Sequence, residues 1–332
     1  MRNNHKIIVI GLLFLTIGSA AGYMVGYSRQ REVLIDKFSD LHPIRENDPA
    51  YNFINPLLAY VIPSSEQEKN LSSLKNKITG IIHKEKNNGL TNASVFMSDL
   101  NRGRWIGVAE NEAYPPASMF KVVIMIAYFK GQEEIPGLFN EKVVYTKEVD
   151  ETVKSATFNS FTNLRVGSSY TIKELIDKMI IDSDNGAEIL LLGHMNKDFF
   201  NFFYEALDIK SPNSDGSFFV SPRAYSLFFR ILYSATYLNK ESSEKALELL
   251  SKTTFTDGIM AGLPKEIRVS HKFGEYIAYE GNNIEEIQLH DCGIVYYPKD
   301  PYLLCIMTKG NNLNVLKNTI KEISSIVYQN HF

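Results

Sequence analysis

A serine and a lysine at the head of an apolar helix are the residues best suited to nucleophilic chemistry. Ser118 and Lys121 lie in the segment Pro-Pro-Ala-Ser-Met-Phe-Lys (115–121), which runs directly into Val-Val-Ile-Met-Ile-Ala (122–127). On a helix, side chains at i and i+3 share a face, with Cβ atoms about 5–6 Å apart. The apolar run predicts a buried helix, and burial lowers the pKa of a lysine. We therefore expect Lys121 to accept the proton of Ser118.

The spacing alone is weak evidence, because Ser72–Lys75 and Ser242–Lys245 match it too. Both of these pairs lie in charged, amphipathic segments, where the side chains can face water. We interpret them as solvated helix faces. Only the Ser118–Lys121 pair opens an apolar helix.

The surrounding sequence predicts the elements that would hold this pair. Helical spacing is expected over 66–86, 171–181, 187–194, 221–237 and 313–328, and strands over 93–100, 105–109, 267–273, 288–297 and 302–308. A sheet interrupted by a helical insertion explains this order, with the terminal helices covering one sheet face. The expected fold class is α+β, an antiparallel sheet with an all-α lobe. A catalytic cleft would lie between the two.

Composition excludes several function classes. The chain has 332 residues, a net charge of −3 and no basic stripe interleaved with aromatics, which argues against nucleic-acid binding. Two cysteines and scattered histidines give no metal-ligand spacing, so we expect no metal and no cofactor. A turn at 298–301 would bring Cys292 and Cys305 close together. We interpret them as free buried thiols, because the geometry of a disulfide is restrictive.

The N-terminal region predicts a membrane anchor. A basic start with Arg2 and Lys6 precedes an apolar run over 7–27, about the length that spans a bilayer. We interpret 1–27 as a signal anchor in a single-pass cell-membrane protein, with a cleaved signal and a secreted product as the alternative. Residues 28–65 would form an extracytoplasmic stalk with little regular structure, although the apolar stretch 51–60 is expected to pack on the domain. Residues 66–332 would form the catalytic domain.

Two further motifs stand downstream of Ser118 and Lys121: Ser183-Asp184-Asn185, and Lys272-Phe273-Gly274 on a predicted strand. The three motifs, in this order, resemble the signature of class A β-lactamases and penicillin-binding proteins. The resemblance extends from about residue 70 to the end of the chain. It implies a β-lactamase-like fold and an active-site serine hydrolase.

The resemblance also implies a role for each motif residue. Ser118 would attack an amide or lactam carbonyl, with Lys121 as its base, and Ser183 would relay a proton to the leaving nitrogen. Asn185 would hold an amide of the substrate, and Lys272 would attract its carboxylate.

The third motif would also shape the oxyanion hole. This site would use the backbone N–H groups of Ser118 and Glu275. Gly274 would let substrate approach the strand closely. Of the neighbouring residues, Asp184 is expected to fix its loop by hydrogen bonding, and His271 to point into the core.

Two departures from the family pattern bear on the substrate. Phe273 stands where the family has threonine or serine, and Glu275 adds negative charge beside it, which puts the binding of ordinary penicillins in doubt. Class A β-lactamases also carry a deacylating glutamate on a loop before the next helix. The interval 208–221 has no Glu-x-x-x-Asn. Asp215 is the acid nearest to that place, and we interpret it as a turn residue. The acyl-enzyme should therefore form and persist.

Three functions stay open at this point. The first is a serine hydrolase of the class A type acting on a β-lactam. The second, which the missing glutamate favours, is a D-alanyl-D-alanine peptidase or weak penicillin binder acting on a peptidoglycan stem peptide. The third is a non-catalytic wall-binding module, which Phe273 and Glu275 favour and the intact motifs oppose. The sequence leaves the oligomeric state open.

Overall fold

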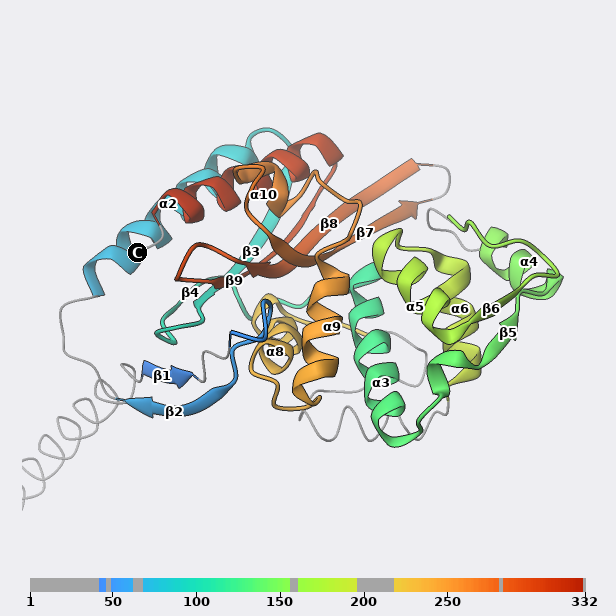
Figure 1. Ribbon diagram of the computed structural model, residues 1–332. Coiled ribbons are helices and arrows are strands. Elements are labelled where there is room, and N and C mark those ends of the chain that lie inside the picture. Colours follow the sequence, from blue (N-terminus) through green and yellow to red (C-terminus); the bar gives the residue numbers. More distant parts are fainter. Residues whose placement is uncertain are drawn as a thin grey trace, which may run out of the picture.

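A five-stranded antiparallel sheet forms the centre of the fold, in the strand order β4–β3–β9–β8–β7 (Figure 1). The computed structural model describes residues 42–45, 49–61, 68–155, 161–195, 218–280 and 283–330. The strands are β3 (Leu90–Asp99), β4 (Trp105–Val108), β7 (Val269–Glu280), β8 (Asn283–Val295) and β9 (Tyr302–Gly310). The expected α+β class with an antiparallel sheet is confirmed.

Two helices far apart in the sequence cover one face of this sheet. They are α2 (Glu68–Lys86) and α10 (Leu313–Gln329), which lie side by side above the strands in Figure 1. Leu74 and Ile78 of α2 and Ile320 and Ile323 of α10 are buried in one apolar cluster. The i, i+3, i+4 spacing of such residues is what makes each helix amphipathic.

The opposite face packs against the helical lobe. Its helices are α3 (Phe120–Glu134), α4 (Lys147–Ser155), α5 (Ile172–Ile181), α6 (Asn185–His194), α8 (Pro222–Tyr233) and α9 (Lys240–Leu250). A short ribbon of β5 (Lys142–Val144) and β6 (Ser169–Thr171) is inserted among them, so the lobe is not wholly helical. The 3-10 turns are η1 (Ala117–Met119), η2 (Leu138–Asn140) and η3 (Ile259–Gly262). Helix α3 runs through the centre of this lobe, and Lys121 to Phe129 are all buried.

The segment before α2 is more ordered than expected. Strands β1 (His42–Arg45) and β2 (Leu57–Val61) form an antiparallel pair in the region expected to lack regular structure. Phe53 and Ile54 are buried, and the Glu244 carboxylate of α9 accepts hydrogen bonds from both of their backbone N–H groups. Residues 51–56 therefore pack on the domain. The anchor expected over 1–27 lies outside the described residues, and no helix in the described ranges is long and apolar enough to cross a membrane.

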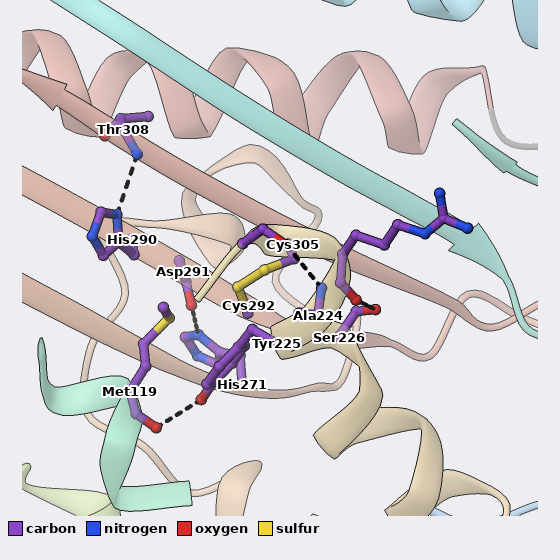
Figure 2. Close-up of a disulfide and its surroundings, with 12 residues drawn as sticks. Met119, Ala224, Tyr225, Ser226, His271, His290, Asp291, Cys292, Cys305 and Thr308 are labelled. Atoms are coloured by element: carbon purple, nitrogen blue, oxygen red, sulfur yellow. Dashed lines mark hydrogen bonds and ion pairs between the residues drawn. A yellow bond between two sulfur atoms is a disulfide. The ribbon is translucent and has the colours of Figure 1, made fainter. Parts of the chain in front are cut away.

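The expectation of free thiols is wrong. Cys292 of β8 and Cys305 of β9 form a disulfide (Figure 2). The register of the two strands places these residues directly opposite each other, with Cα atoms 4.0 Å apart. The hairpin was predictable from its turn. Its register was not, and a shift of one residue would have turned the two side chains to opposite faces.

Candidate active site

Ser118 and Lys121 lie where the 3-10 turn η1 enters α3. The Lys121 Nζ is 3.1 Å from the Ser118 Oγ, as the spacing of the two residues predicts. Ala117, just before the serine, has a φ of 50°, a left-handed conformation that is uncommon for a residue with a Cβ. Strain of this kind concentrates at functional sites, where the surrounding structure holds it in place.

Two buried side chains support the backbone around Ser118. The Tyr225 hydroxyl of α8 donates to the Met119 carbonyl at 2.8 Å, as Figure 2 shows. A ring nitrogen of His290 on β8 lies 3.2 Å from the Pro115 carbonyl. Burial lowers the pKa of His290 to about 4, so this imidazole is neutral at pH 7 and its N–H can donate to that carbonyl. The nucleophile is therefore held from both sides of the turn.

Lys121 also contacts the loop between α5 and α6. Its Nζ is 2.7 Å from the Ser183 carbonyl oxygen, 2.6 Å from Asn185 Oδ1 and 3.2 Å from the Ser183 Oγ. Ser183 adopts a φ of 58°, so this loop too is held in a conformation rare for its residue type.

Asp184 fixes the loop from beneath. Its buried carboxylate accepts hydrogen bonds from the Thr162 hydroxyl and from the backbone N–H groups of Asn163 and Ala187, at 2.7–2.9 Å. The last of these bonds makes Asp184 the N-cap of α6. Asp184 thus has the structural position expected from the sequence.

Lys272 reaches the same loop from β7. Its Nζ donates to the Ser183 Oγ at 3.0 Å and to the Phe273 carbonyl at 3.1 Å. The Phe273 ring covers the amine, with its centroid 4.1 Å from the Nζ, and stacks on Phe255. Lys272 is 0% exposed, and the Phe273 ring is one of the groups that cover its amine.

Burial shifts both lysines toward the neutral amine. The pKa of Lys121 is lowered by burial, against which the negative charge of Glu188 acts. The pKa of Lys272 is well below its usual range because of burial and the neighbouring Lys121 charge. A neutral Lys121 amine has a lone pair, so it can accept the Ser118 proton.

The open edge of the sheet lies beside the serine. A Cβ on Gly274 would lie 2.5 Å from the Pro116 carbonyl oxygen, so glycine is needed here for the close approach of β7 to the chain's own backbone before η1. This is a second reason for glycine here, and the expectation that Gly274 makes room for substrate stays a prediction.

The backbone of Glu275 faces that open edge. The close Cα spacing of Cys292 and Cys305 is typical of an antiparallel pair that exchanges no backbone hydrogen bonds, so the backbone N–H and C=O of Cys292 face Lys272 on β7. The backbone groups of Lys272 therefore face β8. Because this direction alternates along the strand, the N–H of Glu275, three residues further on, points away from β8. Burial raises the pKa of the Glu275 carboxyl.

The structure thus brings five expected residues into one network: Ser118, Lys121, Ser183, Asn185 and Lys272. The two other Ser-x-x-Lys pairs lie on helix surfaces, with Lys75 and Lys245 exposed. Asp215 lies outside the described residues. In the described ranges, no group of three or more His, Cys, Asp or Glu side chains is arranged to hold a metal ion.

His271 points to the face opposite Lys272, as expected. It is buried, and its Nδ1 lies 2.8 Å from Asp291 Oδ1 (Figure 2). The second Asp291 oxygen accepts the Ile259 N–H at 2.8 Å. This buried pair connects β7 and β8 to η3, which packs against α10.

One residue of the network was not predicted from the sequence. Glu188 on α6 places its Oε2 3.4 Å from the Lys121 Nζ. It was identifiable as a lone acid in an otherwise apolar stretch, Gly-Ala-Glu-Ile-Leu-Leu (186–191), one turn beyond Asn185. Residues three apart on a helix share a face, so Glu188 follows Asn185 toward Lys121.

Comparisons with known proteins agree with this geometry. A family model described as "Beta-lactamase enzyme family" matches residues 73–331. A β-lactamase from Streptomyces fradiae is 30% identical over 99 residues, a match that spans 29% of this chain and 31% of that protein.

Solved structures show the same fold at low sequence identity. A mutant of PBP-A in an acyl-enzyme complex with penicillin G is 21% identical, with a TM-score of 0.65 over 78% of this chain and 96% of that chain. A β-lactamase from Chitinophaga pinensis is 18% identical, with a TM-score of 0.66 over 77% of this chain and 98% of that chain.

Proposed function

The chain belongs to the β-lactamase enzyme family, and we propose that it acts as a serine hydrolase that forms an acyl-enzyme on Ser118. The observation that carries the proposal is the hydrogen bond of 3.1 Å between the Ser118 Oγ and the Nζ of a fully buried Lys121. A buried amine next to a hydroxyl is the arrangement that activates a serine without a histidine.

The proposed acylation uses the residues around this pair. Lys121 takes the Ser118 proton as the serine attacks the carbonyl of an amide or lactam. Ser183, in contact with both Lys121 and Lys272, passes a proton to the leaving nitrogen. The Ser118 and Glu275 N–H groups would stabilise the developing oxyanion, and losing one such donor typically costs about 10²–10³ in rate.

Asn185 and Lys272 bear on what the site binds. Asn185 would orient an amide of the substrate, as the family resemblance implies. The Phe273 ring over Lys272 disfavours substrates that depend on a carboxylate at this position. This favours slow reaction with ordinary penicillins.

The fate of the acyl-enzyme separates the two enzymatic candidates. Without a Glu-x-x-x-Asn loop, nothing in the sequence supplies the usual deacylating carboxylate, so we infer a persistent acyl-enzyme. A mutant of PBP-A, which is similar in fold, has been solved as an acyl-enzyme complex with penicillin G. A D-alanyl-D-alanine peptidase or penicillin-binding protein with slow turnover is therefore favoured over an efficient β-lactamase. A non-catalytic wall-binding module is the remaining alternative.

The disulfide supports a location outside the cytoplasm, where such bridges form and persist. With the apolar run over 7–27, it favours an extracytoplasmic domain on a membrane anchor, within reach of peptidoglycan stem peptides. A cleaved and secreted form is the alternative.

The test mixes the purified protein with benzylpenicillin and follows lactam absorbance and intact mass together. The proposal predicts one lasting adduct per chain and slow loss of lactam. Rapid loss of lactam without a lasting adduct would instead identify an efficient β-lactamase. If neither benzylpenicillin nor a D-Ala-D-Ala peptide reacts, the result favours the non-catalytic wall-binding module.

A further inference from the structure

Glu188 stands in the network with no role assigned to it so far. Its side chain is 21% exposed, whereas Lys121 is 0% exposed, and their ion pair at 3.4 Å connects the buried amine to the side of the site that water can reach. Among the described residues, Glu188 is the one carboxylate in ion-pair contact with Lys121.

Counting hydrogens on Lys121 shows what this contact can do. An ammonium group has three protons and a neutral amine has two plus a lone pair. The two shortest contacts, with Asn185 Oδ1 at 2.6 Å and the Ser183 carbonyl at 2.7 Å, are to oxygens that can only accept. These two acceptors take two of the Lys121 protons. The third position is shared between the Ser118 Oγ, the Ser183 Oγ and Glu188 Oε2.

The charges around the amine favour the loss of that third proton. Lys272 of β7 is a second buried amine in the same network, and repulsion disfavours two neighbouring ammonium groups. Asp184 and Asp291 are the other carboxylates whose charge acts on these lysines. Asp184 is occupied by three hydrogen-bond donors and Asp291 by His271 and Ile259, so neither is placed to take a proton from Lys121.

We propose that Glu188 is the proton acceptor that frees Lys121 to act as the base for Ser118, an inference that rests on the proposed acyl-enzyme function. The Lys121 Nζ–H bond breaks and an Oε2–H bond forms on Glu188. Lys121 then takes the Ser118 proton as the Oγ–C bond forms. The C–N bond breaks while Ser183 gives its proton to the leaving nitrogen and regains one from Lys121. Glu188 holds the extra proton throughout, so Lys121 ends the step neutral.

The experiment compares Glu188→Gln and Glu188→Asp with the unmodified full chain. Acylation rates are measured by rapid quench and intact mass between pH 5 and 10. Two probes are used: benzylpenicillin, which has a carboxylate, and p-nitrophenyl acetate, which has none. We expect Glu188→Gln to acylate about 100-fold more slowly at pH 7 with both probes, as is typical for removal of a general base. Its rate should rise with pH, because Lys121 must then lose its proton to solvent. Glu188→Asp, which keeps the carboxylate, should recover part of the rate.

A purely structural ion pair predicts the opposite sign. The Glu188 charge raises the pKa of Lys121, so removing it would give more neutral amine at pH 7 and a rate equal to or above that of the unmodified protein. That result overturns the inference while leaving the acyl-enzyme intact. If the unmodified protein forms no adduct with either probe, the proposed function fails and the inference fails with it.

The matched control is Glu248→Gln, which removes a helix glutamate paired with Lys252 at 2.8 Å on the surface of α9. It should acylate at the unmodified rate with both probes. Circular dichroism melting of each variant checks the fold, and a rate loss in Glu188→Gln with an unchanged melting temperature supports the inference.

Discussion

Two buried amines contact the Ser183 hydroxyl, and this sets the chemistry of the site. Lys121 and Lys272 are both fully buried, and the Ser183 Oγ lies 3.2 and 3.0 Å from their Nζ atoms. Leaving both charged would cost several kcal/mol per ion in desolvation alone. Loss of a proton from Lys121 lowers this cost and gives the lone pair that accepts the Ser118 proton.

Phe273 is the residue expected to limit reaction with penicillins. In Phe273→Thr the ring over Lys272 is lost and a hydroxyl takes its place, so the amine becomes accessible to a carboxylate. Acylation by benzylpenicillin should accelerate about tenfold, the effect of roughly one added hydrogen bond to a charged group. Acylation by p-nitrophenyl acetate serves as the control and should change little. An equal change for both probes would mean that the ring does not guard a carboxylate site.

The chemistry of this site was predictable from the sequence because the residues that indicate it lie close together along the chain. The Ser118–Lys121 spacing and the apolar run behind it are readable directly. Glu188 was not predicted to belong to the site, because a single glutamate in a helix is usually a surface residue. Only the packing of α6 against α3 turns it toward Lys121. Phe273 was recognised as a departure, but the stacking on Phe255 that holds it over Lys272 depends on tertiary structure.

At the level of elements, the start of α6 determines where Ser183 and Asn185 lie. Asp184 caps this helix and also holds Thr162 and Asn163. The cap and the left-handed Ser183 therefore belong to one rigid turn.

The Asp184→Ala variant tests whether Asp184 stabilises this turn. It would remove the buried acceptor of three hydrogen bonds, from the Thr162 hydroxyl and the Asn163 and Ala187 N–H groups, so unfolding free energy should fall by about 3 kcal/mol. Urea unfolding followed by circular dichroism measures the loss. The control is Asn239→Ala, an exposed cap of α9, which should cost about 1 kcal/mol. Equal losses in the two variants would show that Asp184 is an ordinary cap.

Element boundaries were predicted less well than element order. The expected elements from α2 to α10 are observed in the expected order, because apolar periodicity indicates them, but α4 and the β5–β6 ribbon were not predicted. The strand expected over 267–273 extends as β7 to Glu280, and its partner β8 begins at Asn283. Beyond Gly274 the strand is held by pairing with β8 rather than by a buried alternating pattern, so its sequence does not mark the extension.

At the scale of the molecule, one covalent bridge ties β8 to β9 in the middle of the sheet. The Cys292–Cys305 disulfide closes a loop with a sequence separation of 13, and such a loop contributes about 3 kcal/mol to stability. The Cys292→Ala/Cys305→Ala double variant should therefore unfold at lower urea. Unmodified protein treated with reductant in its unfolded state should match it. Two titratable thiols in unreduced, denatured protein would contradict the bridge.

The sheet, its covering helices and the lobe could be predicted as a class from the order of elements. The disulfide could not, because it depends on the register of β8 and β9. The packing of the apolar stretch that includes residues 51–56 was expected from its sequence, but its partners were not, because they lie far away along the chain. Glu244 of α9, for example, accepts the Phe53 and Ile54 N–H groups across 190 or more residues.

Intact mass spectrometry shows whether Ser118 is the nucleophile. The unmodified chain, Ser118→Ala and Ser72→Ala are each incubated with benzylpenicillin and, in parallel, with p-nitrophenyl acetate. Ser72 belongs to the exposed Ser-x-x-Lys pair of α2 and is the matched control. If Ser118 is the nucleophile, one covalent adduct forms on the unmodified and Ser72→Ala chains and none on Ser118→Ala. An adduct that persists in Ser118→Ala would contradict this role of Ser118.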